Sequence, residues 1–133
     1  MSQQKQEQDL DASILNYAVR LGTTARKENV EKSQMEQLIS SLEAYPHQRL
    51  CLPVVAMFAR RQTARNVLGR ETSRLVAEAM MELYKRGQDK AKARVLLGLA
   101  KWVYEAGETL PRERMPVKDF NEFLDLLSGK SSK

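Results

Sequence analysis

Apolar residues recur along the chain at the three- and four-residue spacing that places them on one face of an α-helix. In the first such stripe the apolar residues are Leu10, Ile14, Ala18 and Leu21. Comparable stripes, separated by glycines, prolines and polar stretches, predict helices over roughly residues 10–26, 33–45, 47–68, 71–86, 89–106 and 116–128. The pattern predicts an all-α fold, a compact bundle of about five to six helices.

The predicted helices fit one domain, because the chain has 133 residues and a chain of this length can bury its own core. Residues 1–9 are polar and rich in glutamine, so we expect them to be disordered. Residues 10–128 are expected to form the single helical domain, and residues 129–133 a frayed tail. No apolar stretch approaches the ~18 residues of a membrane span, and the N-terminus does not resemble a signal peptide. We therefore expect no membrane partner and a cytoplasmic location.

Three local features refine this interpretation. Ser33 and Glu36 have the spacing of a capping box, which predicts that the second helix starts at Ser33. Pro53 is either a first-turn residue of the third helix or a kink inside a longer one. Trp102 belongs to an apolar stripe and is expected to lie in the core rather than to stack on a base.

Few residues could support catalysis or bind a metal. His47 is the only histidine and Cys51 the only cysteine, so no intramolecular disulfide can form. Their i, i+4 spacing would place both on one helix face, but Cys51 lies between two leucines and is expected to be a buried, inert thiol. One histidine and one cysteine cannot hold zinc without carboxylates, and no glycine-rich phosphate loop is present. We therefore expect no enzymatic activity, no metal and no cofactor.

Positive charge is concentrated in the middle of the chain. The net charge is +5, and residues 47–86 alone carry eight basic and three acidic side chains. One part of this segment contains a single acid, Glu71, no lysine, and six arginines: Arg49, Arg60, Arg61, Arg65, Arg70 and Arg74. Arginine suits phosphate, because its planar guanidinium donates paired hydrogen bonds and stays charged. The segment therefore favours binding to a polyanion, although a solvated helix face with acidic partners on neighbouring helices is an alternative.

Uncharged donors and helical spacing add detail to the arginine-rich segment. Arg61 and Arg65 are four residues apart and are expected to share a helix face, and on an unbroken helix Arg49 would share a face with Arg60. Gln62 and Asn66 lie among these arginines as further hydrogen-bond donors. Such a surface would bind backbones and shape, not bases.

Three stretches give the chain a resemblance to the small helical subunit of type III, Csm-type, CRISPR effector complexes. They are residues 18–22 followed by 30–34, the leucine-x-proline, aromatic and arginine helix of residues 49–62, and the aromatic helix of residues 97–107. Two departures from the family pattern are Val54-Val55, where the family usually has a lysine, and the additional helix predicted over residues 116–128.

The resemblance implies a non-catalytic subunit that stacks in several copies along the guide RNA–target RNA duplex, beside other subunits of the effector complex. Such a subunit would contact phosphate backbones without reading sequence. The positions that match the family's contacts are Arg49, Arg60 and Arg61, with Lys32 and Lys101 as weaker candidates. Helical spacing, not the family, adds Arg65.

Other function classes stay open at this point. A helical protein–protein adaptor would have an exposed apolar face on the last helix, including Phe120 and Phe123. Another small basic nucleic-acid-binding protein is also consistent with the charge. A helix-turn-helix regulator fits less well, because no arginine cluster opens an evident recognition helix.

Overall fold

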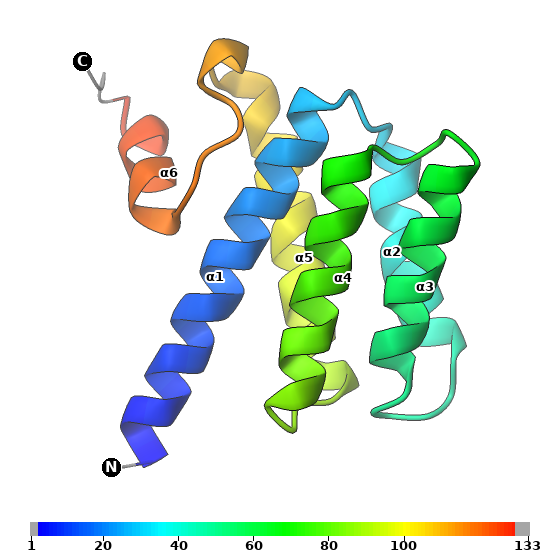
Figure 1. Ribbon diagram of the computed structural model, residues 1–133. Helices are drawn as coiled ribbons and strands as arrows, with labels where there is room; N and C mark the ends of the chain where they lie inside the picture. Colours follow the sequence, from blue (N-terminus) through cyan, green and yellow to red (C-terminus); the bar gives the residue numbers. More distant parts are fainter. Residues whose placement is uncertain (1–2, 130–133) are drawn as a thin grey trace.

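The computed structural model describes residues 3–129, and over that range the chain forms helices without β-strands (Figure 1). The α-helices are α1 (Gln3–Lys27), α2 (Lys32–Ala44), α3 (Cys51–Ala64), α4 (Arg70–Lys85), α5 (Lys90–Ala106) and α6 (Phe120–Leu127). Two 3-10 helices, η1 (Gly107–Thr109) and η2 (Arg112–Arg114), lie between α5 and α6. The predicted all-α bundle is confirmed. No helix in this range is both long and apolar enough to cross a membrane.

The first five helices pack in a closed ring. α1 contacts α4 and α5, α4 contacts α3, α3 contacts α2, and α2 contacts α5. Successive helices run in opposite directions, so α1, α3 and α5 end where α2 and α4 begin (Figure 1). We call this end, drawn at the top of Figure 1, the upper end, and the opposite one the lower end. α6 lies outside the ring, against α1.

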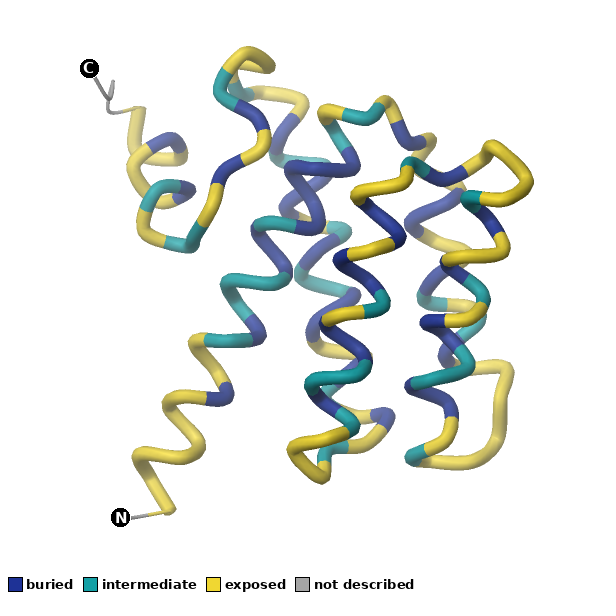
Figure 2. Tube along the Cα trace, viewed as in Figure 1, coloured by how far each residue is buried: buried dark blue, intermediate teal, exposed yellow. Residues whose placement is uncertain are grey.

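The core has two parts, and the buried positions follow the inner faces of the ring (Figure 2). The larger part takes residues from all five ring helices, among them Leu21, Leu38, Leu52, Met80 and Leu96. The smaller part attaches α6 and the segment before it to the ring and consists of Val19, Val103, Val117, Phe123 and Leu126. Tertiary packing of these apolar faces, more than local propensity, stabilises the helices.

Several predicted helix starts need correction, including that of α6, which begins at Phe120 rather than near residue 116. α1 begins at Gln3 rather than Leu10, so residues 3–9, expected to be disordered, continue the helix as an exposed extension. Their helix-forming glutamine, lysine and glutamate side chains account for this. Residues 1–2, and the 130–133 part of the predicted tail, lie outside the described residues.

α2 begins at Lys32, with Glu31 at the N-cap and no side-chain cap bond, so the predicted capping box does not form. Tertiary contacts fix this turn instead, because Val30 is buried and its carbonyl accepts the Tyr104 hydroxyl.

α3 is shorter than predicted at both ends. Pro53 is its third residue, so the first-turn interpretation is correct, and Arg49 lies in the turn that precedes the helix. The helix ends at Ala64, because Asn66 adopts a left-handed conformation with φ of 62°. The amide of Val67 then donates to the carbonyl of Gln62 at 3.0 Å. Arg49 and Arg60 are therefore not on one unbroken helix.

Trp102 is not a core residue, contrary to the prediction. Its side chain is 69% exposed, whereas Tyr104 is buried. The buried stripe of α5 runs through Leu96, Ala100 and Tyr104, and a residue two positions away from that stripe points to the opposite side of a helix.

Candidate nucleic-acid interface

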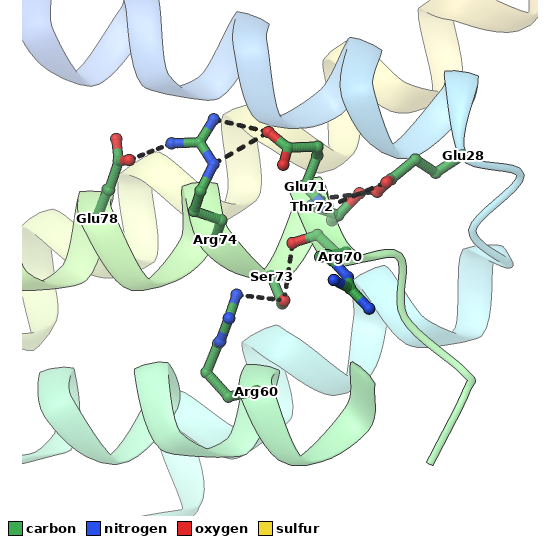
Figure 3. A network of polar contacts seen from close by, with 8 residues as sticks. All are labelled: Glu28, Arg60, Arg70, Glu71, Thr72, Ser73, Arg74 and Glu78. Atoms are coloured by element: carbon green, nitrogen blue, oxygen red, sulfur yellow. Dashed lines mark hydrogen bonds and ion pairs between the residues drawn. The ribbon is translucent and has the colours of Figure 1, made fainter. Parts of the chain in front are cut away.

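Four arginines gather where α3 ends and α4 begins, at the upper end of the ring. We call Arg60, Arg61, Arg65 and Arg70 the arginine edge. All four are exposed. Arg60 extends from α3 toward α4, where its Nη1 donates to the Ser73 hydroxyl at 3.0 Å (Figure 3). The buried Ser73 donates in turn to the carbonyl of Arg70, so this contact links the two helices.

Arg61 lies in the last turn of α3 and Arg65 is the C-cap residue of that helix, one turn or about 6 Å further along the axis. Arg61 Nη1 donates to Gln62 Oε1 at 3.0 Å. Gln62 is only 2% exposed, and its amide nitrogen donates to Gln34 and Gln37 of α2, at 2.9 and 3.3 Å. Gln62 therefore holds α3 against α2 and is not the free donor that the sequence suggested.

Within residues 3–129, no ion pair involves any member of the arginine edge. The sixth arginine, Arg74, differs: it bonds Glu71 Oε1 through Nη2 at 2.8 Å and also pairs with Glu78 (Figure 3). The alternative of a fully neutralised helix face therefore applies to Arg74 and not to the arginine edge.

Glu71 lies near both the arginine edge and Arg74. Its hydrogen bonds with Arg74 hold the pKa of its carboxyl below the ordinary value, and the nearby charges of Arg60 and Arg70 act in the same direction. Arg74 also pairs with Glu78, so these three residues together carry one net negative charge, against the four positive charges of the arginine edge.

The start of α4 is held in place by a carboxylate from another helix connection. Glu28, just after α1, accepts the amides of Glu71 at 3.1 Å and Thr72 at 2.8 Å, and the Thr72 hydroxyl at 2.6 Å (Figure 3). These donors are among the first amides of a helix, which have no partner inside it. The carboxylate also complements the positive end of the α4 dipole. Glu28 thereby fixes the start of α4, and with it the position of Arg70, the first residue of this helix.

Arg49 lies at the lower end, one α3 length from Arg65, which is about 20 Å at 1.5 Å per residue. Its guanidinium stacks over the Tyr84 ring at 4.4 Å and donates to the carbonyls of Tyr84 and Gln88. Arginine at a helix C-terminus satisfies carbonyls that lack a partner there. Arg49 therefore joins the start of α3 to the end of α4 and is not brought together with the arginine edge.

Lys32 and Lys101 lie on the α2–α5 side of the ring. Lys32 pairs with Glu105 at 3.2 Å, and Lys101 pairs with Glu36 at 3.5 Å. Exposed pairs of this kind contribute about 0–1 kcal/mol, so either lysine could exchange its glutamate for a phosphate. They still form a separate site from the arginine edge, which lies on α3 and α4.

His47 and Cys51 do not form a catalytic pair. His47 Nδ1 accepts the backbone amides of Arg49 and Leu50, at 3.2 and 3.0 Å. Cys51 is fully buried and donates to the Gln48 carbonyl, and this burial raises the pKa of its thiol. The expected burial of this thiol is confirmed. Among the described residues, no group of three histidine, cysteine, aspartate or glutamate side chains is placed to hold a metal.

The apolar face that an adaptor would use is not formed by the expected phenylalanines. Phe123 is 4% exposed and Phe120 is half-buried, since both pack toward α1 and α5. The exposed apolar side chains of this region are Trp102, Leu124 and Leu127 instead.

Comparison with models of known protein families, with curated proteins and with solved structures found no match for this chain. The resemblance to the CRISPR subunit, and the contact residues carried over from it, therefore stay predictions. Arg70 belongs to the basic segment identified from the sequence, but the sequence did not indicate it as a contact residue. Its place beside Arg60 depends on how α3 and α4 pack, for which the sequence has no local signal.

Proposed function

We propose that this protein is a non-catalytic subunit of a type III CRISPR ribonucleoprotein that binds RNA phosphates through the arginine edge. The observation that carries the proposal is the set of four exposed guanidinium groups at one junction, without acidic partners among residues 3–129. Guanidinium groups bind phosphate oxygens with paired, charge-assisted hydrogen bonds. Such contacts position a nucleic acid without reading its bases.

In this proposal the ligand is the guide RNA–target RNA duplex, and several copies of the chain associate along it in a filament beside the other subunits. A cytoplasmic location is part of the proposal. A-form RNA is recognised mainly through its backbone and shape, which suits a rigid edge of arginines. Arg60 is held by Ser73 and Arg61 by Gln62, so the cost of ordering these two side chains on binding is reduced.

The test is RNA binding by the variant Arg60→Ala/Arg61→Ala, measured by fluorescence anisotropy with a duplex RNA across a salt titration. Each lost phosphate contact reduces the slope of log K against log salt by roughly one. We expect the double variant to bind RNA more weakly at low salt, with a slope smaller by about one to two. Duplexes of different sequence should be affected alike.

A matched control removes two charges elsewhere. Arg86 pairs with Glu82 and Arg94 pairs with Glu43, both away from the arginine edge. The variant Arg86→Ala/Arg94→Ala should keep a slope close to that of the parent. If Arg60→Ala/Arg61→Ala binds RNA as the parent does at every salt concentration, the arginine edge is not the interface. Gel filtration with and without RNA separates this role from that of a protein-only adaptor.

A further inference from the structure

A cleft of about 450 Å³ opens on the side of α4 that faces α1, where the segment 116–118 closes it. Its basic lining residues come from three separate parts of the chain: Arg20 and Lys27 from α1, Arg74 from α4, and Lys118 from the segment before α6. The volume is in the range of clefts that bind small organic ligands. This side of α4 is opposite the contact between Arg60 and Ser73, so the cleft is a different feature from the arginine edge (Figure 3).

The two acids of the cleft lining, Glu28 and Glu71, already have hydrogen-bond partners. Glu28 accepts three hydrogen bonds from the start of α4, and Glu71 is bonded twice by Arg74. In contrast, none of the ion pairs within residues 3–129 involves Arg20, Lys27 or Lys118. The lining therefore has four basic side chains against two acidic ones, a formal net charge of +2, and three of the basic ones have no ion pair in that range. Such a charge balance favours an anion.

Apart from Thr24, the remaining lining is apolar, and it indicates what else the anion would carry. Leu75, Pro116 and Val117 contribute to the wall of the cleft, where Pro116 is exposed and Leu75 and Val117 are largely buried. A bare phosphate would leave this wall unused, whereas an organic phosphate can place an apolar or aromatic group against it. The planar guanidinium of Arg74, held by Glu71 and Glu78, adds a surface on which a ring can stack.

We infer that the α1–α4 cleft binds a nucleotide phosphate, with the phosphate at Arg20, Lys27 and Lys118 and the base against Leu75, Pro116 and Val117. The same chemistry is present in a free nucleoside monophosphate and in the 5′-phosphorylated end of an RNA strand. The site goes beyond the function proposed above and does not depend on it, because its residues are not those of the arginine edge.

The first experiment uses isothermal titration calorimetry of the full chain with adenosine monophosphate and with adenosine. We expect the monophosphate to bind saturably. Adenosine should bind at least about tenfold more weakly than the monophosphate, because it lacks the phosphate that accepts the charge-assisted hydrogen bonds. The variant Lys27→Ala/Lys118→Ala changes two exposed side chains and should weaken binding of the monophosphate by a similar factor. The variant Lys85→Ala/Lys92→Ala removes two lysines at the lower end and should bind as the parent does.

The second experiment uses a short single-stranded RNA with either a 5′-phosphate or a 5′-hydroxyl, titrated into Arg60→Ala/Arg61→Ala. In this variant, RNA binding by the arginine edge is reduced. If the variant prefers the 5′-phosphate, and if this preference disappears when Lys27→Ala/Lys118→Ala is added, the cleft binds the end of the strand. Binding of the free monophosphate without such a preference assigns the free nucleotide. Three outcomes would overturn the inference. They are monophosphate binding that is unchanged in Lys27→Ala/Lys118→Ala, adenosine binding as strong as that of the monophosphate, and no binding of either the monophosphate or the 5′-phosphorylated RNA. None of these outcomes depends on whether Arg60 and Arg61 bind RNA.

Discussion

Among the glycines, Gly69 has the shortest contact for an added Cβ atom. A Cβ atom built there would lie 2.0 Å from Oε1 of Glu28, the carboxylate that accepts the first amides of α4. We predict that Gly69→Ala lowers the free energy of unfolding by about 1–3 kcal/mol, because moving the carboxylate leaves those amides without their partner. Urea unfolding followed by circular dichroism measures the change.

Gly98 provides the matched control for this prediction. It lies inside α5, and a Cβ built there meets nothing within 4 Å. Gly98→Ala should therefore raise stability by about 0.5–1 kcal/mol, as expected when glycine is replaced in a helix. The effect of Gly69→Ala should shrink in a Glu28→Ala background, and full additivity of the two changes would show that the clash with Glu28 is not its cause.

The state of each arginine was only partly predictable from the sequence. Arg74 has acids at i−3 and i+4, a spacing that indicates ion pairs on a helix. Arg49 bonds Tyr84, which is 35 residues away, so nothing near it in the sequence indicates that it is engaged. The difference between an engaged and an unpaired arginine therefore depends on tertiary contacts, and the arginine-rich segment could be identified only as a whole.

At the scale of the elements, Arg49 connects the beginning of α3 with the end of α4. We predict that Arg49→Ala destabilises the protein by about 1–3 kcal/mol, since it leaves carbonyls at the end of α4 without a donor and removes the stacking on Tyr84. RNA binding by the folded variant should keep the salt dependence of the parent. Urea unfolding and the RNA titration together check both parts.

Arg65→Ala is the control for this comparison and should behave in the opposite way. Arg65 is exposed at the end of α3, so its loss should leave stability within about 0.5 kcal/mol while reducing the salt slope. If Arg49→Ala is as stable as the parent and reduces the slope, Arg49 is a contact residue, as the family resemblance implies.

The helices themselves were predictable, but their ends were less so. Apolar spacing identified all six α-helices, because each buries one continuous stripe. The capping box at Ser33 was wrong, because burial of Val30 and its bond with Tyr104 set the turn into α2. Both partners of that bond are 74 residues apart, so a local rule could not anticipate it.

At the scale of the whole molecule, the closed ring depends on contacts between its first and last helices, α1 and α5. α1 packs on α5, and a Cβ at Gly22 would lie 2.6 Å from the carbonyl oxygen of Ala100. This pairing turns Tyr104 inward and leaves Trp102 outside, which the apolar pattern of α5 alone did not decide. The order of helices around the ring was likewise not predictable, since similar amphipathic stripes are compatible with several arrangements.

Because the core is divided into two clusters, we predict that α6 can unfold separately from the ring. Phe123 belongs to the smaller cluster, which joins α6 to the ring, and not to the larger one. Phe123→Ala should remove about 3–5 kcal/mol of local packing and release α6 and the segment 116–118 without opening the ring. The Phe120 amide bond to Asn16 and the Val117 amide bond to Thr23 are then expected to break first.

Hydrogen exchange measured by mass spectrometry distinguishes this local release from global unfolding, because amides exchange according to the smallest unit that opens them. In Phe123→Ala, exchange should accelerate in residues 116–127 and stay unchanged in α2 and α3. Leu38→Ala, in the larger cluster, should accelerate exchange throughout the ring. If Phe123→Ala accelerates α2 and α3 as much as α6, the two clusters unfold as one unit. The Lys118 side of the α1–α4 cleft would then be as stable as the ring, not a separately mobile wall.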